Sequence, residues 1–193
     1  MEELVDIKNY AKLHGVPIAQ DESSDFICTY IKEHNCKKVL EIGTAIGFSS
    51  IKFAQASEGV FVTTVESDID RHIKAKDNIH QHGLDDKINA VYADALKWQS
   101  DEKFDLIFID GAKAQYINFF EKYKENLAPG GVIITDNLSF HGMVEDMSLT
   151  YNYSTKRLVR KIRKYIEFLQ ANTEFHTDYY KCGDGISVSS RIN

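Results

Sequence analysis

Three polar side chains mark the ends of two apolar stretches of this sequence. Asp110 ends FDLIFID (residues 104–110), and Asp136 and Asn137 end GGVIITDN (residues 130–137). If both stretches are neighbouring parallel strands, their carboxyl ends meet at one edge of a sheet. Three hard oxygen donors at that edge suit Mg²⁺, Mn²⁺ or Ca²⁺ better than zinc, and water and substrate oxygens would complete the coordination. The alternative is that Asp136 and Asn137 only cap a turn.

Lys113 follows Asp110 by three residues. It is either a solvated lysine at the start of a helix or a general base beside the metal site. A nearby divalent cation would favour the neutral amine, which is the form that accepts a proton.

A second group of residues points to a nucleoside-bearing ligand. In EIGTAIGFSS, Gly43 and Gly47 allow a tight turn and a close approach of the backbone to a ligand, and Glu66 ends the next apolar stretch 23 residues after Gly43. An acid at this position accepts hydrogen bonds from a ribose diol. Both the P-loop and the dinucleotide glycine spacing are absent, so we expect a ligand that carries a ribose but no pyrophosphate. S-adenosylmethionine is such a ligand. A tight turn followed by an exposed acid is the alternative.

Asp94 and Ala95 end another predicted strand and would lie beside the adenine. Asp94 could also cap the next short helix, and the two roles are compatible.

The elements that must position these residues alternate along the chain. Apolar, β-branched runs predict strands at 37–43, 60–66, 88–94, 104–110 and 130–137, and helical patterns occupy 48–57, 68–83 and 113–127 between them. Two helices, near 2–14 and 22–34, precede the first strand, an amphipathic helix spans 156–170, and the tail predicts a hairpin around Gly183-Asp184-Gly185 at the sheet edge. This order is typical of a doubly wound α/β fold with a mostly parallel sheet and helices on both faces.

Length and composition limit the class of protein. The chain has 193 residues, 27% charged residues and a formal net charge of −6, which fits one domain and argues against a non-specific nucleic-acid binder. No signal peptide or membrane span is recognisable. Cys28, Cys36 and Cys182 have neither a disulfide nor a zinc spacing, so we expect a cytoplasmic protein.

Together, VLEIGTAIGFSS, FDLIFIDGAKAQY, GGVIITDN and the closing GDG resemble the cation-dependent, S-adenosylmethionine-dependent O-methyltransferases, which include catechol and caffeoyl-coenzyme A O-methyltransferases. The resemblance runs from about Val16 to the C-terminus. It implies one domain over 1–193, with N-terminal helices over 1–36 and a Rossmann-like core of seven strands, the last reversed, over 37–193. It also implies a homodimer.

The same resemblance assigns roles to individual residues. It implies a divalent cation, with Mg²⁺ favoured, held by Asp110, Asp136 and Asn137, and Lys113 as the catalytic base. The S-adenosylmethionine contacts that it implies are Ala19, Gly43, Thr44, Ser49, Glu66, Asp94, Ala95 and Asp110.

Within the family, HGVPI, KAQYINFF and the basic helix before the hairpin are most similar to bacterial enzymes that methylate 5-hydroxyuridine at the tRNA wobble position. The helix is a candidate tRNA contact, and its positive residues are Lys156, Arg157, Arg160, Lys161, Arg163 and Lys164. A solvated helix face is the alternative.

Three other functions remain as rivals. Catechol presents two vicinal oxygens as 5-hydroxyuridine does, so a small catechol-like phenol is the alternative substrate. A non-catalytic RNA-binding or regulatory protein that keeps the same fold is a rival of another class. A nicotinamide-dependent dehydrogenase is disfavoured by the missing pyrophosphate turn.

Overall fold

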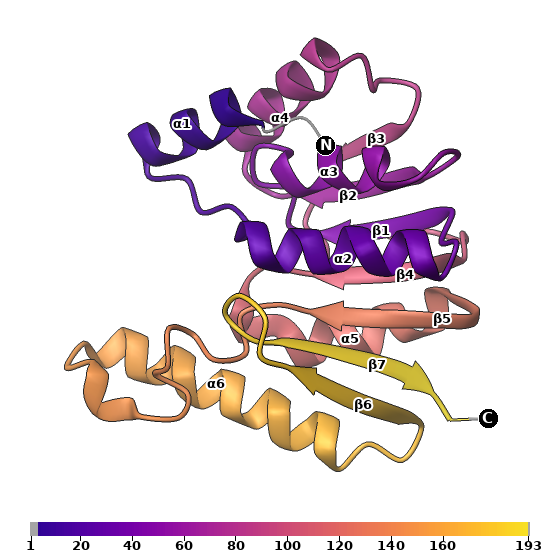
Figure 1. Cartoon of the computed structure of the whole chain (residues 1–193). Coiled ribbons are helices and arrows are strands. Elements are labelled where there is room, and N and C mark those ends of the chain that lie inside the picture. The colour runs from indigo at the N-terminus through magenta and orange to yellow at the C-terminus, as the bar shows by residue number, and fades with distance from the viewer. Residues whose placement is uncertain (1–3, 193) are drawn as a thin grey trace.

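The computed structural model describes residues 4–192, and its centre is a seven-stranded sheet. The strands are β1 (Lys38–Ile42), β2 (Phe61–Glu66), β3 (Ile88–Tyr92), β4 (Phe104–Ile109), β5 (Leu127–Thr135), β6 (Phe175–Tyr180) and β7 (Ile186–Arg191). Their order across the sheet is β3-β2-β1-β4-β5-β7-β6 (Figure 1). The pairs among β1 to β5 are parallel, whereas β7 runs antiparallel to both β5 and β6. The predicted fold class, the reversed last strand and the edge hairpin are therefore confirmed.

The order of the strands reverses between β1 and β4. From β1 the chain builds outward to β2 and β3, then returns to β4 and builds in the other direction. In open α/β sheets, ligands bind outside the carboxyl ends of the strands at such a switch point. The sequence positions that end β1, β2, β4 and β5 therefore meet on one side of the molecule.

Each face of the sheet is covered by its own group of helices. In β4, Leu106 and Phe108 pack into one apolar cluster, and Ile107 and Ile109 pack into the other. The first cluster lies under α1 (Val5–His14), α2 (Asp21–Glu33), α3 (Phe48–Ala56) and α4 (Ile69–Gln81), and the second under α5 (Tyr116–Tyr123) and α6 (Tyr153–Gln170). A central parallel strand that is buried on both faces is apolar, which explains the apolar run LIFI at residues 106–109 of β4.

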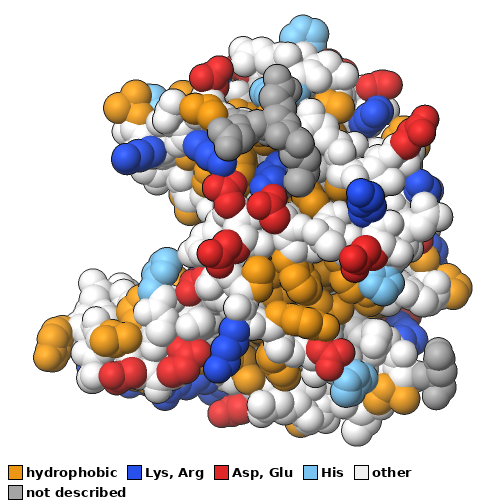
Figure 2. Space-filling model, viewed as in Figure 1, with side chains coloured by type: hydrophobic (Ala, Val, Ile, Leu, Met, Phe, Trp, Pro, Cys, Tyr) orange, Lys and Arg blue, Asp and Glu red, His pale blue; other side chains and the backbone are white. Residues whose placement is uncertain are grey.

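The carboxyl ends of the strands face a hollow in the surface. Figure 1 shows the arrows of β1, β4 and β5 pointing to the side where α1 lies above and the β5–α6 connection lies below. The space-filling view in Figure 2 shows the surface hollowed between these two lobes. A substrate can therefore approach the strand ends from this side.

The predicted helix over 113–127 is wrong in its extent. The segment divides into a 3-10 turn, η1 (Lys113–Gln115), then α5, then a second 3-10 turn, η2 (Lys124–Asn126). Strand β5 begins at Leu127, earlier than predicted, so Pro129 and Gly130 lie within it. The register against β4 shifts between Phe104 and Leu106, and Gly130 has a φ of +77°, so an irregular strand accommodates both residues.

Two other helix boundaries differ by a few residues. Helix α6 begins at Tyr153, three residues before the predicted start, because the Asn152 side chain accepts a hydrogen bond from the Thr155 N–H and caps it. Helix α1 begins at Val5, and residues 2 and 3 of the predicted helix lie outside the described residues. Within residues 4–192, no helix has the length and apolar character needed to span a bilayer.

Candidate active site

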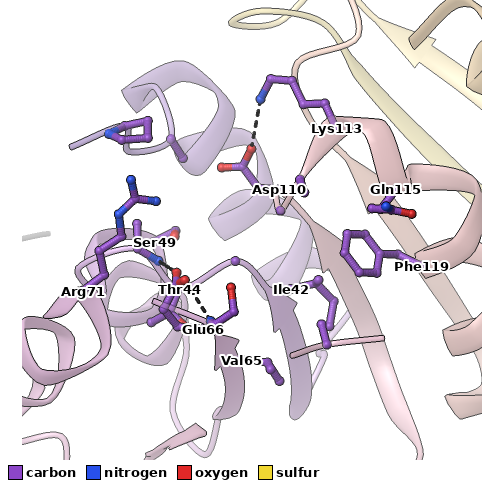
Figure 3. A pocket seen from close by; sticks show the side chains of 18 of the residues that line it. Ile42, Thr44, Ser49, Val65, Glu66, Arg71, Asp110, Lys113, Gln115 and Phe119 are labelled. Atoms are coloured by element: carbon purple, nitrogen blue, oxygen red, sulfur yellow. Dashed lines mark hydrogen bonds and ion pairs between the residues drawn. The ribbon is translucent and has the colours of Figure 1, made fainter. Parts of the chain in front are cut away.

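A cavity of about 630 Å³ lies at the carboxyl ends of β1, β2 and β4. Its lining includes every residue predicted to contact the cofactor, namely Ala19, Gly43, Thr44, Ser49, Glu66, Asp94, Ala95 and Asp110. Lys113 and Asn137 also line it. Figure 3 shows Glu66 and Arg71 on one side of this cavity and Asp110 and Lys113 on the other. The cavity thus extends from the predicted nucleoside site to two of the three predicted metal ligands, and the third, Asp136, is buried and does not line it.

The glycine-rich turn after β1 passes very close to the end of β4. Gly43 has a φ of +105°, and a Cβ on it would lie 2.9 Å from the Asp110 backbone oxygen and from Gly111. Only glycine fits this position. Underneath the turn, the fully buried Glu41 accepts hydrogen bonds from the hydroxyls of Ser49, Ser50 and Thr64. Sequence reasoning missed this acid, which is hidden within the β1 strand pattern.

The Glu66 carboxylate is fixed by three backbone amides. Its Oε2 accepts the Ala45 N–H at 2.8 Å, and its Oε1 accepts the N–H groups of Ser67 and Asp68 at 2.9 Å each. These bonds hold the charged carboxylate in one orientation at the cavity wall, with lone pairs left for further donors. This arrangement suits a pair of vicinal hydroxyls.

Replacing Glu66 with glutamine is expected to weaken S-adenosylmethionine binding by roughly 10- to 100-fold, because hydrogen bonds to a charged acceptor contribute about 1.5–3 kcal/mol. The glutamine amide would also direct an NH₂ group at backbone N–H donors. Isothermal titration calorimetry measures the change. Glu58→Gln, an exposed site beyond α3, is the control, and equal affinities for the two variants would contradict a ribose contact at Glu66.

The 94–98 turn is held by residues of α5. Asp94 Oδ1 accepts the Leu96 N–H at 2.9 Å, so Asp94 caps the turn while also lining the cavity. The Ala95 carbonyl accepts hydrogen bonds from Lys122 Nζ at 2.9 Å and from the Tyr123 hydroxyl at 2.6 Å. Sequence reasoning did not identify Lys122 or Tyr123, which become relevant only when α5 packs beside this turn.

Asp110, Asp136 and Asn137 come together as predicted. Asn137 Nδ2 donates to Asp110 Oδ1 at 2.7 Å, and the Asn137 N–H donates to Asp136 Oδ1 at 2.7 Å. Asn137 has a φ of +64°, an uncommon left-handed conformation that directs its side chain across to β4. A half-turn of its amide would direct the carbonyl oxygen to the same point. The three side chains can therefore present oxygens from two neighbouring strand ends.

The charge at this site fits a divalent cation. Burial, followed by the neighbouring Asp136, raises the pKa of Asp110 to about 7, although Lys113 acts in the opposite direction. Burial also raises the pKa of Asp136. Two buried carboxylates with one lysine leave negative charge uncompensated, and a cation bound between them would compensate it. Within residues 4–192, no group of three His, Cys, Asp or Glu side chains could hold a metal ion. The predicted site has two carboxylates, and its third donor is the amide of Asn137.

Lys113 begins the 3-10 turn η1, rather than the regular helix that we expected. Its Nζ lies 4.0 Å from Asp110 Oδ1 and 5.9 Å from the centre of the Phe140 ring. Both side chains of the ion pair are largely buried, with 20% of Lys113 and 15% of Asp110 exposed. The amine is therefore held at the cavity wall next to the proposed metal ligands.

None of the six basic residues of α6 lines this cavity. They lie along α6, which together with α5 covers one face of the sheet, whereas the cavity lies at the ends of the strands. Arg163 differs from the rest, because its Nε donates to the Val144 carbonyl at 2.8 Å and its Nη2 donates to the same oxygen. Arg163 thus holds the β5–α6 connection, whereas the sequence pattern grouped it with a surface stripe.

The fold and the site define the class of the protein: a Rossmann-like, S-adenosylmethionine-dependent methyltransferase. A family model described as O-methyltransferase matches residues 1–192, and the chain belongs to this family.

Comparison with individual proteins agrees with this assignment. The chain is 27% identical to caffeoyl-CoA O-methyltransferase of Populus kitakamiensis, with 96% of this chain and 82% of the relative covered. It is 26% identical to flavonoid 3',5'-methyltransferase of Vitis vinifera, covering 99% and 84%. A crystal structure from Staphylococcus aureus, provisionally named caffeoyl-CoA O-methyltransferase, superposes with a TM-score of 0.94 at 33% identity, covering 100% and 93%. An O-methyltransferase of Bacillus cereus in complex with SAH gives a TM-score of 0.83 at 26% identity, covering 98% and 90%.

Proposed function

We propose that this chain transfers a methyl group from S-adenosylmethionine, in a divalent-metal-dependent reaction, to a hydroxyl that lies next to a second oxygen. We propose further that its substrate is 5-hydroxyuridine at the wobble position of tRNA, which becomes 5-methoxyuridine. The observation that carries the reaction type is the convergence of Asp110 and Asn137 beside Lys113 in the cavity that Glu66 also lines, with the buried Asp136 directly behind Asn137.

In this proposal the S-adenosylmethionine ribose binds Glu66, and the adenine lies along Asp94 and Ala95. Both contacts fix the nucleoside end, so that the sulfonium methyl faces the Asp110 side of the cavity. The SAH complex of the Bacillus cereus relative, at 26% identity, supports a cofactor of this type.

A divalent cation at Asp110, Asp136 and Asn137 would lower the pKa of a bound hydroxyl and align it with the adjacent substrate oxygen. Mg²⁺ is the first choice, and Mn²⁺ or Ca²⁺ would suit the same oxygens. Lys113 accepts the hydroxyl proton at Nζ, and the substrate oxygen attacks the methyl carbon as the sulfur leaves. The Lys113 and Asp110 side chains are only 20% and 15% exposed, and such poorly solvated surroundings favour a reaction in which opposite charges neutralise.

Four exposed cations of α6 support an RNA substrate. Arg157, Arg160, Lys161 and Lys164 follow the spacing i, i+3, i+4, i+7 and therefore share one side of the helix. No carboxylate within residues 4–192 forms an ion pair with any of them. We call these four residues the α6 stripe. Unpaired positive charges on a chain of net charge −6 suit the phosphates of a polyanion.

Exposed aromatic residues adjoin the stripe. Tyr151 is 95% exposed and Tyr153 is 71% exposed, both at the amino end of α6. Lys156 Nζ lies 5.8 Å from the centre of the Tyr151 ring. Bases of single-stranded RNA stack on such rings, so this end of α6 suits an unpaired anticodon loop.

Reversing two charges of the α6 stripe, Arg160→Glu with Lys161→Glu, is expected to lower kcat/KM for tRNA by roughly 10-fold or more at fixed salt, because phosphate contacts dominate affinity. Methylation of a small catechol should stay unchanged. The control is Lys32→Glu with Lys76→Glu, exposed positions on α2 and α4 that change the net charge equally. Arg163 is left intact because it holds the Val144 carbonyl. Full tRNA activity in the stripe variant would exclude this surface as the RNA contact.

A small catechol-like phenol is the second candidate substrate. It is favoured by the relatives, since one is named for caffeoyl-CoA and another for a flavonoid. Catechol offers two vicinal oxygens, as 5-hydroxyuridine does with its O5 hydroxyl and O4 carbonyl. Mass spectrometry of tRNA nucleosides from cells with and without the gene decides between the two. Loss of 5-methoxyuridine supports tRNA, and unchanged nucleosides with retained catechol methylation support the phenol.

The proposal also includes that the chain forms a homodimer in the cytoplasm.

If the protein binds S-adenosylmethionine but shows no EDTA-sensitive methyl transfer to either substrate, it is instead a non-catalytic protein that keeps the methyltransferase fold.

A further inference from the structure

Asp136 receives a hydrogen bond from a residue far away in the sequence. Ser23, in the first turn of α2, donates its hydroxyl to Asp136 Oδ1 at 3.1 Å across 113 residues of chain. Ser23 is 0% exposed and Asp136 is 1% exposed, so solvent does not compete for this bond. The same Oδ1 accepts the Asn137 N–H at 2.7 Å. Two donors on one oxygen fix the carboxylate plane and leave Oδ2 for another partner.

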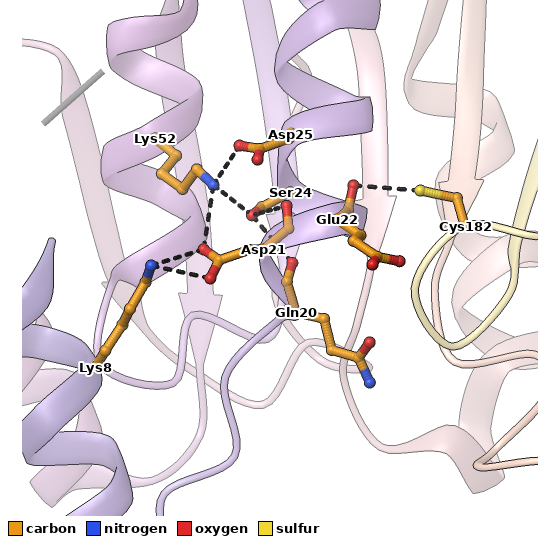
Figure 4. Close-up of polar contacts among 8 residues, drawn as sticks. All are labelled: Lys8, Gln20, Asp21, Glu22, Ser24, Asp25, Lys52 and Cys182. Carbon is orange, nitrogen blue, oxygen red and sulfur yellow. Dashed lines mark hydrogen bonds and ion pairs between the residues drawn. The ribbon is translucent and has the colours of Figure 1, made fainter. Parts of the chain in front are cut away.

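The hairpin between β6 and β7 holds Ser23 in place from the other side. A Cβ on Gly183 would lie 2.2 Å from Ser23 Oγ, so only glycine lets the hairpin come this close. The Gly183 N–H donates to Glu22 Oε2 at 3.1 Å. Cys182 Sγ donates to the Glu22 carbonyl at 3.3 Å, as Figure 4 shows. The hairpin is thereby fastened to the first turn of α2.

The hairpin also binds the backbone that follows the metal ligands. The Leu138 and Ser139 N–H groups donate to the carbonyls of Gly185 and Asp184 at 3.0 Å and 2.7 Å. Asp184 Oδ1 accepts the His141 N–H at 2.6 Å. The segment that carries Asp136 and Asn137 is therefore fixed by Ser23 on one side and by the hairpin just beyond it.

We propose that Ser23 is a positioning residue that orients Asp136 toward the divalent cation, with the hairpin holding Ser23 against the carboxylate. This inference rests on the metal site of the proposed function. The hydroxyl contacts neither cofactor nor substrate in this role, because it acts only through Asp136. Groups that orient metal ligands in this way typically change metal affinity by about 10- to 100-fold when removed.

Ser24 is a matched control on the same turn of α2. It is also 0% exposed, and its hydroxyl donates to the carbonyls of Gln20 and Asp21 at 3.0 Å each. Lys52 Nζ donates to Ser24 Oγ at 2.7 Å (Figure 4). Ser23→Ala and Ser24→Ala thus each remove one fully buried hydroxyl from α2, but only the first removes a bond to a metal ligand.

The test measures Mn²⁺ affinity by electron paramagnetic resonance on the full chain, without cofactor or substrate. Ser23→Ala should bind Mn²⁺ roughly 10- to 100-fold more weakly than the wild type, and Ser24→Ala should bind it with near wild-type affinity. Ser23→Cys keeps a weak donor of similar size and should fall between Ser23→Ala and the wild type. It also serves as the test if the alanine variant does not fold.

The outcomes separate this inference from the proposed function. Wild-type Mn²⁺ binding together with unchanged affinity in Ser23→Ala would overturn the positioning role alone. An equal loss in Ser24→Ala would also overturn it, because general weakening of α2 would then explain both. A wild-type chain that binds no Mn²⁺ would overturn the metal site itself, and the positioning role with it.

Discussion

Asp136→Asn is expected to bind Mn²⁺ on the order of 100-fold more weakly than the wild type, because hard cations depend on carboxylate charge. Methyl transfer should fall with it. The metal-free variant should nevertheless be at least as stable as the wild type. The replacement keeps the shape of the side chain, and an asparagine oxygen can still accept the bonds from Ser23 and the Asn137 N–H. Function and stability should therefore change in opposite directions.

The physical reason is the cost of burying two negative charges. Burial raises the pKa of both Asp110 and Asp136. In the metal-free fold the charged form of each side chain is therefore less favourable, relative to the protonated form, than it is in water. A neutral amide at position 136 relieves this cost. It also removes charge that a cation needs, as expected where function and stability compete.

A pH dependence of stability follows from the same groups. The pKa of Asp110 rises from 3.8 to about 7 on folding, so between these values the folded chain binds more protons than the unfolded chain. The contribution of Asp110 to the unfolding free energy of the EDTA-treated protein should therefore decrease as pH rises from about 4 to 7, by up to ~1.4 kcal/mol per pH unit for one proton. Added Mg²⁺ should restore stability at the upper end of this range.

Thermal unfolding with EDTA or with Mg²⁺ measures these changes alongside Mn²⁺ titration. Asp101→Asn, an exposed loop position, is the control and should change neither quantity. An Asp136→Asn variant that keeps wild-type metal affinity would contradict the proposed ligand set.

Lys113→Met is expected to lower kcat by roughly 10²- to 10⁴-fold, the usual contribution of a general base. S-adenosylmethionine affinity should change little, because the methionine keeps the unbranched stem beside Phe140. Removing a positive charge 4.0 Å from Asp110 Oδ1 should leave Mn²⁺ affinity equal or higher. A lysine that served only as the counter-ion of Asp110 would give the same metal result with an unchanged kcat.

The pH–rate profile adds a second readout. Without Lys113, the proton must leave to solvent, so the variant's rate should rise with pH as hydroxide replaces the amine. Lys38→Met, at the amino end of β1 where Lys38 pairs with Glu102 at 3.1 Å, is the control far from the site. A kcat near the wild-type value in Lys113→Met would remove the base from the proposal.

Much of the fold could be predicted from local patterns. Strand β4 and the second half of β5 are nearly continuous apolar runs because they are buried on both faces, and this leaves a strong sequence signal. Predictions were less accurate where tertiary contacts override local preference. The pattern of residues 113–127 predicts one helix. In the structure this segment forms η1, α5 and η2, and β5 begins at Leu127 and includes Pro129 and Gly130.

The sequence by itself determined which chemical groups end the strands. Asp110, Asp136, Asn137 and Glu66 are all polar residues that directly follow or close apolar runs, and parallel strands bring such ends together at one edge. Only the tertiary structure decided how these groups are held. Ser23 donates a hydrogen bond to Asp136, 113 residues away in the sequence. Arg163 donates to the Val144 carbonyl and does not belong to the α6 stripe. A hydrogen bond between distant segments depends on how helices and hairpins pack on the sheet, and no local pattern of residues encodes that packing.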